Sequence, residues 1–208
     1  IKYRFMPTQW DKSKTILLFK NGDPNDLKNW RPLTIAPCLY RIWTGALAST
    51  LQIINKNTKI FHPHQKGFIK GVDGCMEHSN MITEMIFDAN RSRRDLYVVA
   101  IDFRDAFGSI PHSYIKYILK KMNFPEEIRA IIEDSYNNGE TRVHIDSDIS
   151  QSIDVNRGVK QGCPFSPLIF NFCINPLITE LELIGEGFEI KEGTKIVVQA
   201  YADDIVLF

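Results

Sequence analysis

Three aspartates stand beside apolar runs in this sequence. Asp203 and Asp204 are adjacent within "QAYADDIVLF", and Asp102 follows the run "LYVVAI". Apolar flanks predict buried strands, and a carboxylate buried without a partner is costly. Two charges about 4 Å apart repel by about 4 kcal/mol at an effective dielectric of 20, and a divalent cation removes that repulsion. The aspartates are therefore candidate metal ligands, and a solvated turn at Asp203 and Asp204 is the alternative interpretation.

The two apolar runs predict where these acids meet. If both runs are neighbouring strands of one sheet, Asp102 lies beside Asp203, and three carboxylates converge on a site for two Mg²⁺ ions. Two metal ions about 3.5–4 Å apart activate an attacking oxygen and stabilise a leaving oxygen in phosphoryl transfer. Periodicity predicts only the strand ends, so the adjacency of the strands is an inference.

Other residues suit a substrate that carries phosphates. Lys20 and Arg31 occur in "FKNGD" and "NWRP", on opposite limbs of an expected hairpin, and both cations bind phosphate oxygens. Gln161 and Gly162 precede an expected helix, where glycine permits close approach of a ligand and glutamine both donates and accepts hydrogen bonds. Phe107 suits the wall beneath a nucleotide sugar. The alternatives are surface cations, an ordinary loop before a capped helix, and a core phenylalanine.

The elements that position these residues follow from periodicity and turn signals. The predicted strands cover residues 15–20, 30–35, 96–103 and 141–145, with a hairpin continuing to 155 and two further strands meeting at the Asp203–Asp204 pair. The predicted helices cover residues 36–56, 74–90, 111–122, 125–136 and 166–184. This mixture predicts an α+β fold in which helices pack on one face of an antiparallel sheet.

Composition narrows the class of protein. The 208 residues carry 25 basic and 25 acidic side chains, and 44% are hydrophobic, which is enough for a real core. Residues 1–41 nevertheless carry a net charge of +5, which suits a part that holds phosphates, and uneven surface charge is the alternative. The four cysteines form no CxxC pair, so neither a zinc site nor a disulfide framework is indicated. No membrane span or signal peptide is expected.

Four segments in a fixed order carry a family resemblance. They are "LFKNGDPNDLKNWRPLTI", "AIDFRDAF", "QGCPFSPLIFN" and "YADD". Together they resemble a reverse transcriptase, from about residue 15 to residue 208. The blocks "NWRPLTIAPCLYRIWTGALASTLQ", "QKGF" with "GVDGCMEHSNMI", and "GVKQGCPFSPLIFN" are similar to the non-LTR retrotransposon lineage, including its site-specific members.

The resemblance implies roles for individual residues. Asp102, Asp203 and Asp204 match the metal-binding catalytic acids, and the backbone carbonyl of Phe103 matches a further metal ligand. The residues that match the nucleotide-binding positions are Lys20 and Arg31 for the triphosphate, Asp105 and Ala106 for the triphosphate and sugar pocket, Phe107 for the steric gate against a ribose 2′-OH, and Gln161 and Gly162 for the loop that contacts the incoming nucleotide and template base. The implied cofactor is a pair of Mg²⁺ ions, with Mn²⁺ as an alternative.

The resemblance also implies a right-hand polymerase with fingers and palm. We expect residues 1–95 to be mainly fingers, 96–140 to be palm with the first catalytic strand, 141–165 to connect fingers and palm, and 166–208 to hold the palm helix and the YADD hairpin. Relatives often carry Asp after the gate aromatic, where this chain has Gly108, which affects lineage placement more than chemistry. The thumb and the endonuclease region are expected to be absent from this sequence.

The implied activity is RNA-directed DNA synthesis, with an RNA template, a DNA primer or target, and a dNTP as partners and no membrane. The expected localisation is intracellular, in a nuclear ribonucleoprotein. A group II intron or retron enzyme is one alternative. A non-catalytic RNA-binding scaffold descended from a polymerase is another, although such a scaffold is expected to lose the metal-binding acids.

Overall fold

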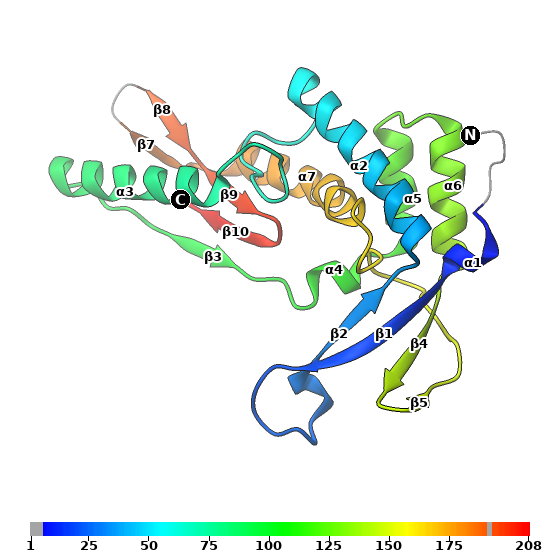
Figure 1. Ribbon diagram of the computed structural model, residues 1–208. Coiled ribbons are helices and arrows are strands. Elements are labelled where there is room, and N and C mark those ends of the chain that lie inside the picture. The colour runs from blue at the N-terminus through cyan, green and yellow to red at the C-terminus, as the bar shows by residue number, and fades with distance from the viewer. Residues whose placement is uncertain (1–5, 191–192) are drawn as a thin grey trace. The chain divides into compact units, whose positions relative to one another are not determined.

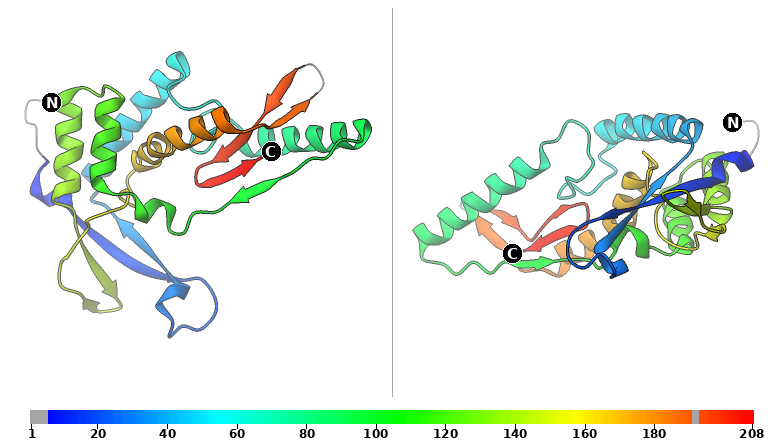
Figure 2. Two further views of the ribbon diagram at one scale, coloured as in Figure 1. Left: turned by 180° about the vertical axis from the view of Figure 1, so that it is seen from behind. Right: turned by 60° about the horizontal axis from the view of Figure 1, so that its bottom comes forward.

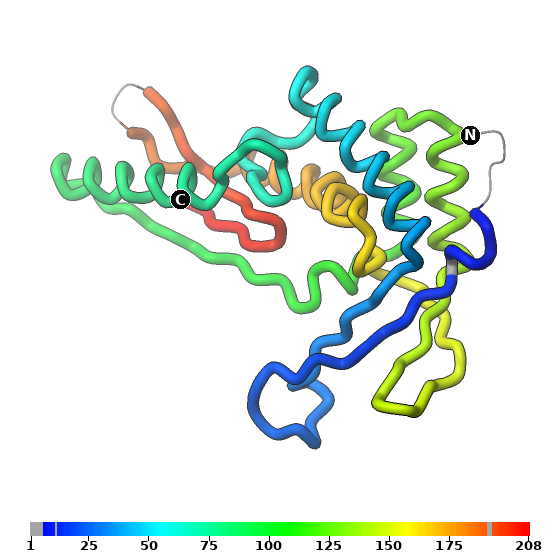
Figure 3. Tube along the Cα trace, in the orientation of Figure 1, coloured from blue at the N-terminus to red at the C-terminus, as the bar shows by residue number. Residues whose placement is uncertain are grey.

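The computed structural model describes residues 6–190 and 193–208 (Figure 3). The chain divides into two compact units, each assembled from two separate stretches of sequence. The first unit comprises residues 1–49 and 107–169, and the second comprises residues 50–106 and 170–208. The boundaries expected after residues 95, 140 and 165 do not coincide with these borders, so the assignment of those segments to fingers and palm stays a prediction.

The first unit is built on a mixed sheet (Figure 1). Its strands are β1 (Lys12–Phe19), β2 (Trp30–Ile35), β4 (Glu140–Ile145), β5 (Asp148–Ile149) and β6 (Ile153–Asp154). Strand β1 pairs antiparallel with β2, as the expected hairpin requires, and parallel with β4. The buried hydroxyl of Thr15 lies 2.9 Å from that of Thr34 and 2.8 Å from that of Thr141, so one side chain joins all three strands.

Helices of the first unit begin where the prolines predict. The short segments are α1 (Thr8–Asp11), a 3-10 turn (Leu27–Asn29) and α4 (Ala106–Ser109), whose first residue belongs to the second unit. The longer helices are α5 (His112–Lys121) and α6 (Glu126–Asn137). Pro111 and Pro125 precede α5 and α6, since proline lacks the N–H that a first helical turn leaves unpaired. Both helices bury one apolar stripe, which includes Leu119 and Ile132.

Two longer helices contain residues of both units. They are α2 (Cys38–Thr58) and α7 (Ser166–Ile184), close to the expected helices over residues 36–56 and 166–184. Among the described residues, α7 alone is long and apolar enough to cross a membrane, with a mean hydropathy of 1.3. Length and composition are weak grounds here, because Phe170, Phe172 and Ile178 of α7 are buried within the protein, as in the core helix of a globular domain.

The second unit is built on an antiparallel sheet. Its elements are helix α3 (Gly74–Ser92), the sheet strands β3 (Val99–Ile101), β9 (Val198–Tyr201) and β10 (Asp204–Leu207), and a separate hairpin of β7 (Phe188–Ile190) and β8 (Thr194–Ile196). Strand β10 lies between β3 and β9 (Figure 2). Ile178 of α7 packs against Val198, Ala200 and Ile205, which confirms an antiparallel sheet with a helix on one face. The strand expected over residues 96–103 covers only Val99–Ile101, and Tyr97 and Val98 precede it. The prediction that this strand is buried is wrong, since Tyr97, Val98 and Val99 are all exposed.

A loop segment extends this sheet beyond β9. Gln65 pairs in parallel with Ala200, the Lys66 N–H donates to the Ala200 carbonyl at 2.9 Å, and the Ala200 N–H donates to the His64 carbonyl at 2.9 Å. The segment 62–67 therefore lies directly beside the strand that leads into the YADD turn.

Candidate active site

The two adjacent aspartates do not both occupy the turn of their hairpin. Asp204 pairs with Tyr201, so the two turn residues are Ala202 and Asp203, and Asp204 is the first residue of β10. The sequence interpretation of a turn built on Asp203 and Asp204 is thus wrong by one residue. Ala202 has a φ of 56°, a value that two-residue hairpins of this kind usually obtain from glycine. An alanine in this conformation must be held there by its surroundings.

Strands β3 and β10 are neighbours, as predicted from the two apolar runs. Ile101 pairs with Ile205, and continuing this antiparallel register by one residue places Asp102 opposite Asp204. Directly opposite residues of an antiparallel pair share a face of the sheet. Asp102 and Asp204 are exposed and Asp203 is half-buried, so the premise that these carboxylates are buried is wrong. The apolar flanks face α7, while the acids stand at the open end of the strands.

The acidic end of the sheet suits a divalent cation in its donor type. Carboxylate and carbonyl oxygens are the ligands that Mg²⁺ prefers. Among the side chains that the structure describes, no three Asp, Glu, His or Cys form a group that could hold a metal ion. No described Lys or Arg pairs with any of the three acids either. Chemistry and backbone register therefore fit a metal, and the convergence of the side chains on one ion stays a prediction.

Three further predicted residues follow Asp102 in the second unit. The half-buried side chain of Phe103 packs against the cluster formed by Ile205 and its neighbours. Asp105 is exposed with a φ of 50°, and Ala106 is buried at the start of α4. The bend at Asp105 thus ends the extended segment that carries Asp102.

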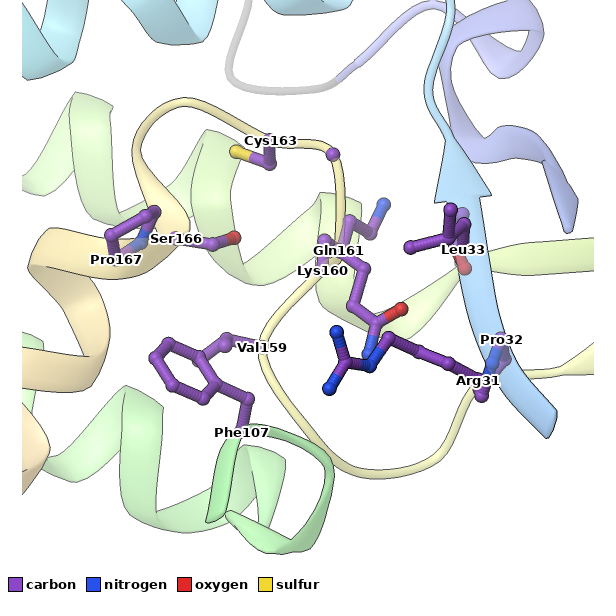
Figure 4. A pocket seen from close by; sticks show the side chains of 12 residues that line it. Arg31, Pro32, Leu33, Phe107, Val159, Lys160, Gln161, Cys163, Ser166 and Pro167 are labelled. Atoms are coloured by element: carbon purple, nitrogen blue, oxygen red, sulfur yellow. The ribbon is translucent and has the colours of Figure 1, made fainter. Parts of the chain in front are cut away.

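A pocket of about 330 Å³ lies entirely within the first unit (Figure 4). Its wall includes Arg31, Phe107, Gln161 and Gly162, four of the residues predicted to contact a nucleotide. Figure 4 shows the Arg31 side chain extending from β2 beside the Gln161 carboxamide, with Phe107 next to Val159. Residues that sequence reasoning did not single out complete the wall, and they include Leu33, Val159, Lys160 and Ser166.

Backbone contacts shape this pocket. The Val159 N–H donates to the Phe107 carbonyl at 2.8 Å, which fixes the aromatic residue against the loop that carries Gln161. Gly162 has a φ of 75°, and a Cβ there would lie 2.3 Å from the carbonyl oxygen of Thr34. Only glycine allows this approach of the loop to β2. Packing against β2 therefore explains a glycine at position 162, and its role in access for a ligand stays a prediction.

His112, which was not among the predicted site residues, supports the same loop. His112 donates from Nε2 to the Gly158 carbonyl at 3.0 Å, and burial lowers the pKa of His112 below its usual value. A Cβ on Gly158 would lie 2.8 Å from the Cα of Gly108. The absence of a side chain at position 158 thus allows this loop to lie directly on the backbone of Gly108.

Lys20 lies outside the pocket. It follows β1, its N–H donates to the Asn29 carbonyl at 2.8 Å, and it is exposed at the end of the hairpin. It occupies the limb opposite Arg31, as predicted, since Arg31 pairs with Leu18 of β1. The structure therefore brings four predicted nucleotide contacts together in the first unit and leaves Lys20 apart from them.

Comparison with known proteins decides the family. Residues 19–208 match the family described as reverse transcriptase (RNA-dependent DNA polymerase). The chain belongs to this family. As a reverse transcriptase domain it is 34% identical, over 97% of its length, to 28% of a Pol polyprotein from the type-1 retrotransposable element R2 of Popillia japonica. It is also 22% identical, over 96% of its length, to 21% of the RNA-directed DNA polymerase from the mobile element jockey of Drosophila melanogaster.

These relatives confirm the predicted non-LTR retrotransposon lineage, and the chain spans less than a third of their length. Solved structures confirm the polymerase fold of this reverse transcriptase domain. A telomerase from Candida tropicalis in complex with a fragment of telomeric RNA matches 97% of the chain and 36% of its own length, with a TM-score of 0.65 at 10% identity. A truncated apo form matches 95% of the chain and 43% of its own length, with a TM-score of 0.60 at 12% identity. At such low identity the likeness concerns the fold alone.

Proposed function

We propose that this reverse transcriptase domain catalyses RNA-directed DNA synthesis in a non-LTR retrotransposon. In that reaction a primer 3′-OH attacks the α-phosphorus of a dNTP, a P–O bond forms, and pyrophosphate leaves. The observation that carries the proposal is the pairing of β3 with β10, which brings Asp102, Asp203 and Asp204 to one end of a sheet.

The proposal assigns metal binding to the second unit. Asp102, Asp203, Asp204 and the backbone carbonyl of Phe103 would hold two Mg²⁺ ions, with Mn²⁺ as a substitute. When bound, such ions lower the pKa of the attacking hydroxyl and neutralise charge on the triphosphate. The three aspartates have no cationic partner among the described residues, so their charge is available for this task.

Nucleotide binding falls to residues of the first unit and to Asp105 and Ala106. The Arg31 guanidinium offers a planar pair of donors to phosphate oxygens, and Lys20 adds a point charge. Phe107 supplies an apolar wall that excludes a ribose 2′-OH and so favours deoxynucleotides. Gln161 offers both a donor and an acceptor to the incoming nucleotide, while Gly162 allows its loop to approach that nucleotide.

The proposed partners are an RNA template, a DNA primer or target, and dNTPs. The proposed setting is a ribonucleoprotein inside the cell, in the nucleus where the target DNA resides. Thumb and endonuclease regions of a longer polypeptide would grip the primer and cut the target.

Primer extension on an RNA template tests the proposal directly. We expect the full-length protein with Mg²⁺ and dNTPs to extend the primer, and Asp203→Ala to reduce the rate by at least about 10³-fold, because charge stabilisation in the transition state is lost. Asp95→Ala is the control, since Asp95 is an exposed aspartate of the same unit that lies outside the acidic turn. Unchanged synthesis by Asp203→Ala would refute the metal assignment. Tight RNA binding without any extension by the wild type would favour the scaffold alternative.

A further inference from the structure

One buried side chain holds the turn that carries Asp203. Gln65 is 2% exposed, and its Oε1 accepts the Ala202 N–H at 2.8 Å and the Gly67 N–H at 2.9 Å. Its Nε2 donates to the Ala202 carbonyl at 3.0 Å. A single carboxamide thus satisfies both backbone groups of Ala202, the residue immediately before the aspartate.

Ala202 needs such support because of its conformation. Its φ of 56° lies in the left-handed region, where a Cβ is unfavourable, and the residue is 4% exposed. A non-glycine residue persists there only when its surroundings fix it. Without the two bonds from Gln65, the buried N–H and carbonyl of Ala202 lack their partner and the turn is free to take a more relaxed conformation.

The segment that carries Gln65 is itself fixed to the rest of the second unit. A Cβ on Gly67 would lie 2.3 Å from the Ala202 nitrogen, so the segment that carries Gln65 lies directly against the turn. The Gly67 carbonyl accepts a hydrogen bond at 2.8 Å from Nδ2 of Asn171, a fully buried residue of α7. Backbone pairing between Gln65 and Ala200 anchors the same segment to β9. The core helix α7 and the sheet therefore fix the position of the turn through this segment.

We propose that Gln65 is a positioning residue for the acidic turn, holding Ala202 so that the Asp203 carboxylate is correctly placed relative to Asp102. The inference rests on the proposed function, in which these aspartates bind metal. Within the described part of the chain, the Gln65 side chain hydrogen-bonds to the backbone of Gly67 and Ala202, so it acts on Asp203 through the Ala202 backbone. The task requires a carboxamide, because it needs one acceptor for two N–H groups and one donor for a carbonyl.

Two substitutions of Gln65 in the full-length protein separate this role from simple packing. Gln65→Met keeps the length of the side chain and removes all three hydrogen bonds, and Gln65→Glu keeps the acceptor and removes the donor. We expect Gln65→Met to lower kcat by about 10–100-fold, as for residues that orient metal ligands, and Gln65→Glu to fall between it and the wild type. The KM for dNTP should change less than kcat, since the side chains proposed to hold the nucleotide directly do not belong to the turn.

Measurements that need no activity test the same claim. Hydrogen exchange of the Ala202 amide should accelerate in Gln65→Met by at least about tenfold, because its acceptor is lost. Mn²⁺ binding followed by electron paramagnetic resonance should weaken by about tenfold. Adding Ala202→Gly to Gln65→Met should restore part of kcat, because glycine takes positive φ without a Cβ penalty.

Gln52→Met provides the matched control. Gln52 makes bonds of the same kind, donating to the Phe68 carbonyl at 2.7 Å and accepting the Lys70 N–H at 3.2 Å, but it does not contact the turn. It should leave kcat, Ala202 exchange and Mn²⁺ affinity unchanged.

The outcomes distinguish the two proposals. A folded Gln65→Met with wild-type kcat, Ala202 exchange and Mn²⁺ affinity would overturn the positioning role. If Gln65→Met does not fold, Gln65→Glu and the double variant are judged by the same criteria. An inactive wild type would count against the proposed function, while exchange at Ala202 and Mn²⁺ binding would still decide the role of Gln65.

Discussion

The acidic end of the second unit and the pocket of the first unit are built in opposite ways. At the acidic end, Asp102 and Asp204 are exposed with no ion-pair partner among the described residues, and the Gln65 side chain holds the turn between β9 and β10. In the pocket, backbone groups fix the wall, through Val159 on Phe107 and Gly162 against Thr34. At the acidic end a side chain holds the backbone of the turn while the carboxylates point away from the core, whereas in the pocket the backbone itself forms the fixed surface.

The largest effect that tests this contrast is expected from Gly162→Ala. The new Cβ would meet the Thr34 carbonyl oxygen at 2.3 Å on a backbone with a φ of 75°, so β2 or the loop must move. We expect a loss of about 4 kcal/mol or more in the free energy of unfolding, measured by urea denaturation.

Gly71→Ala isolates the steric part of that effect. Gly71 has a similar φ of 78°, but nothing lies within 4 Å of a Cβ placed there. Its cost should be limited to backbone strain, about 1–2 kcal/mol. Equal losses for the two variants would contradict the claim that close backbone packing shapes the pocket.

A smaller effect is expected from Arg31→Lys, which keeps the charge of a pocket side chain and removes its planar pair of donors. The KM for dNTP should rise about tenfold, equivalent to about 1.4 kcal/mol, with little change in kcat. Arg41→Lys is the control, because Arg41 is an exposed arginine of the same unit that bonds to Cys38. A fall in kcat with an unchanged KM would show that Arg31 acts in the chemical step.

The smallest effect concerns pH and the loop behind the pocket. Burial lowers the pKa of His112 in the folded state, so the unfolded chain binds protons more readily. The stability contributed by neutral His112 should be complete above about pH 6.5 and should decline as the pH falls below that value. Denaturation at pH 7.5 and 5.5 should show a smaller decline for His112→Gln, which retains a donor for Gly158 without titrating. Identical declines in the wild type and the variant would exclude His112 as the source.

Much of the fold could be predicted from local pattern. Prolines at 111 and 125 and the apolar stripes that follow them fixed the starts of α5 and α6, and the continuous apolar runs located β3 and β10. The parallel pairing of β1 with β4 could not be predicted, because it joins Lys12 to Glu140 and leaves no local signal. The division into two discontinuous units escaped prediction for the same reason.

The residues of the candidate site could be predicted from the sequence better than their burial and contacts. Residue types identified the acids, Arg31, Phe107 and the Gln161 loop, but apolar flanks overstated the burial of Asp102 and Asp204, since the end of a strand is open where its middle is covered. Gln65 could not be assigned a role from sequence, because its importance lies in three contacts with residues 67 and 202. A glutamine two residues before a glycine in "QKGF" was the one available signal.

The pairing of β1 with β4 also determines when the sheet of the first unit can be completed during synthesis. β1 begins at Lys12 and its parallel partner begins at Glu140, so the ribosome must add 128 residues after Lys12 to reach the start of β4. At roughly 5–20 residues per second, β1 waits about 6–26 s for this neighbour. During that interval the β1–β2 hairpin presents an unpaired strand edge, with Leu18 and Phe19 nearby and exposed even in the finished fold. The nascent chain is therefore most open to misassociation before β4 is made, and a chaperone that covers β1 would act in that window.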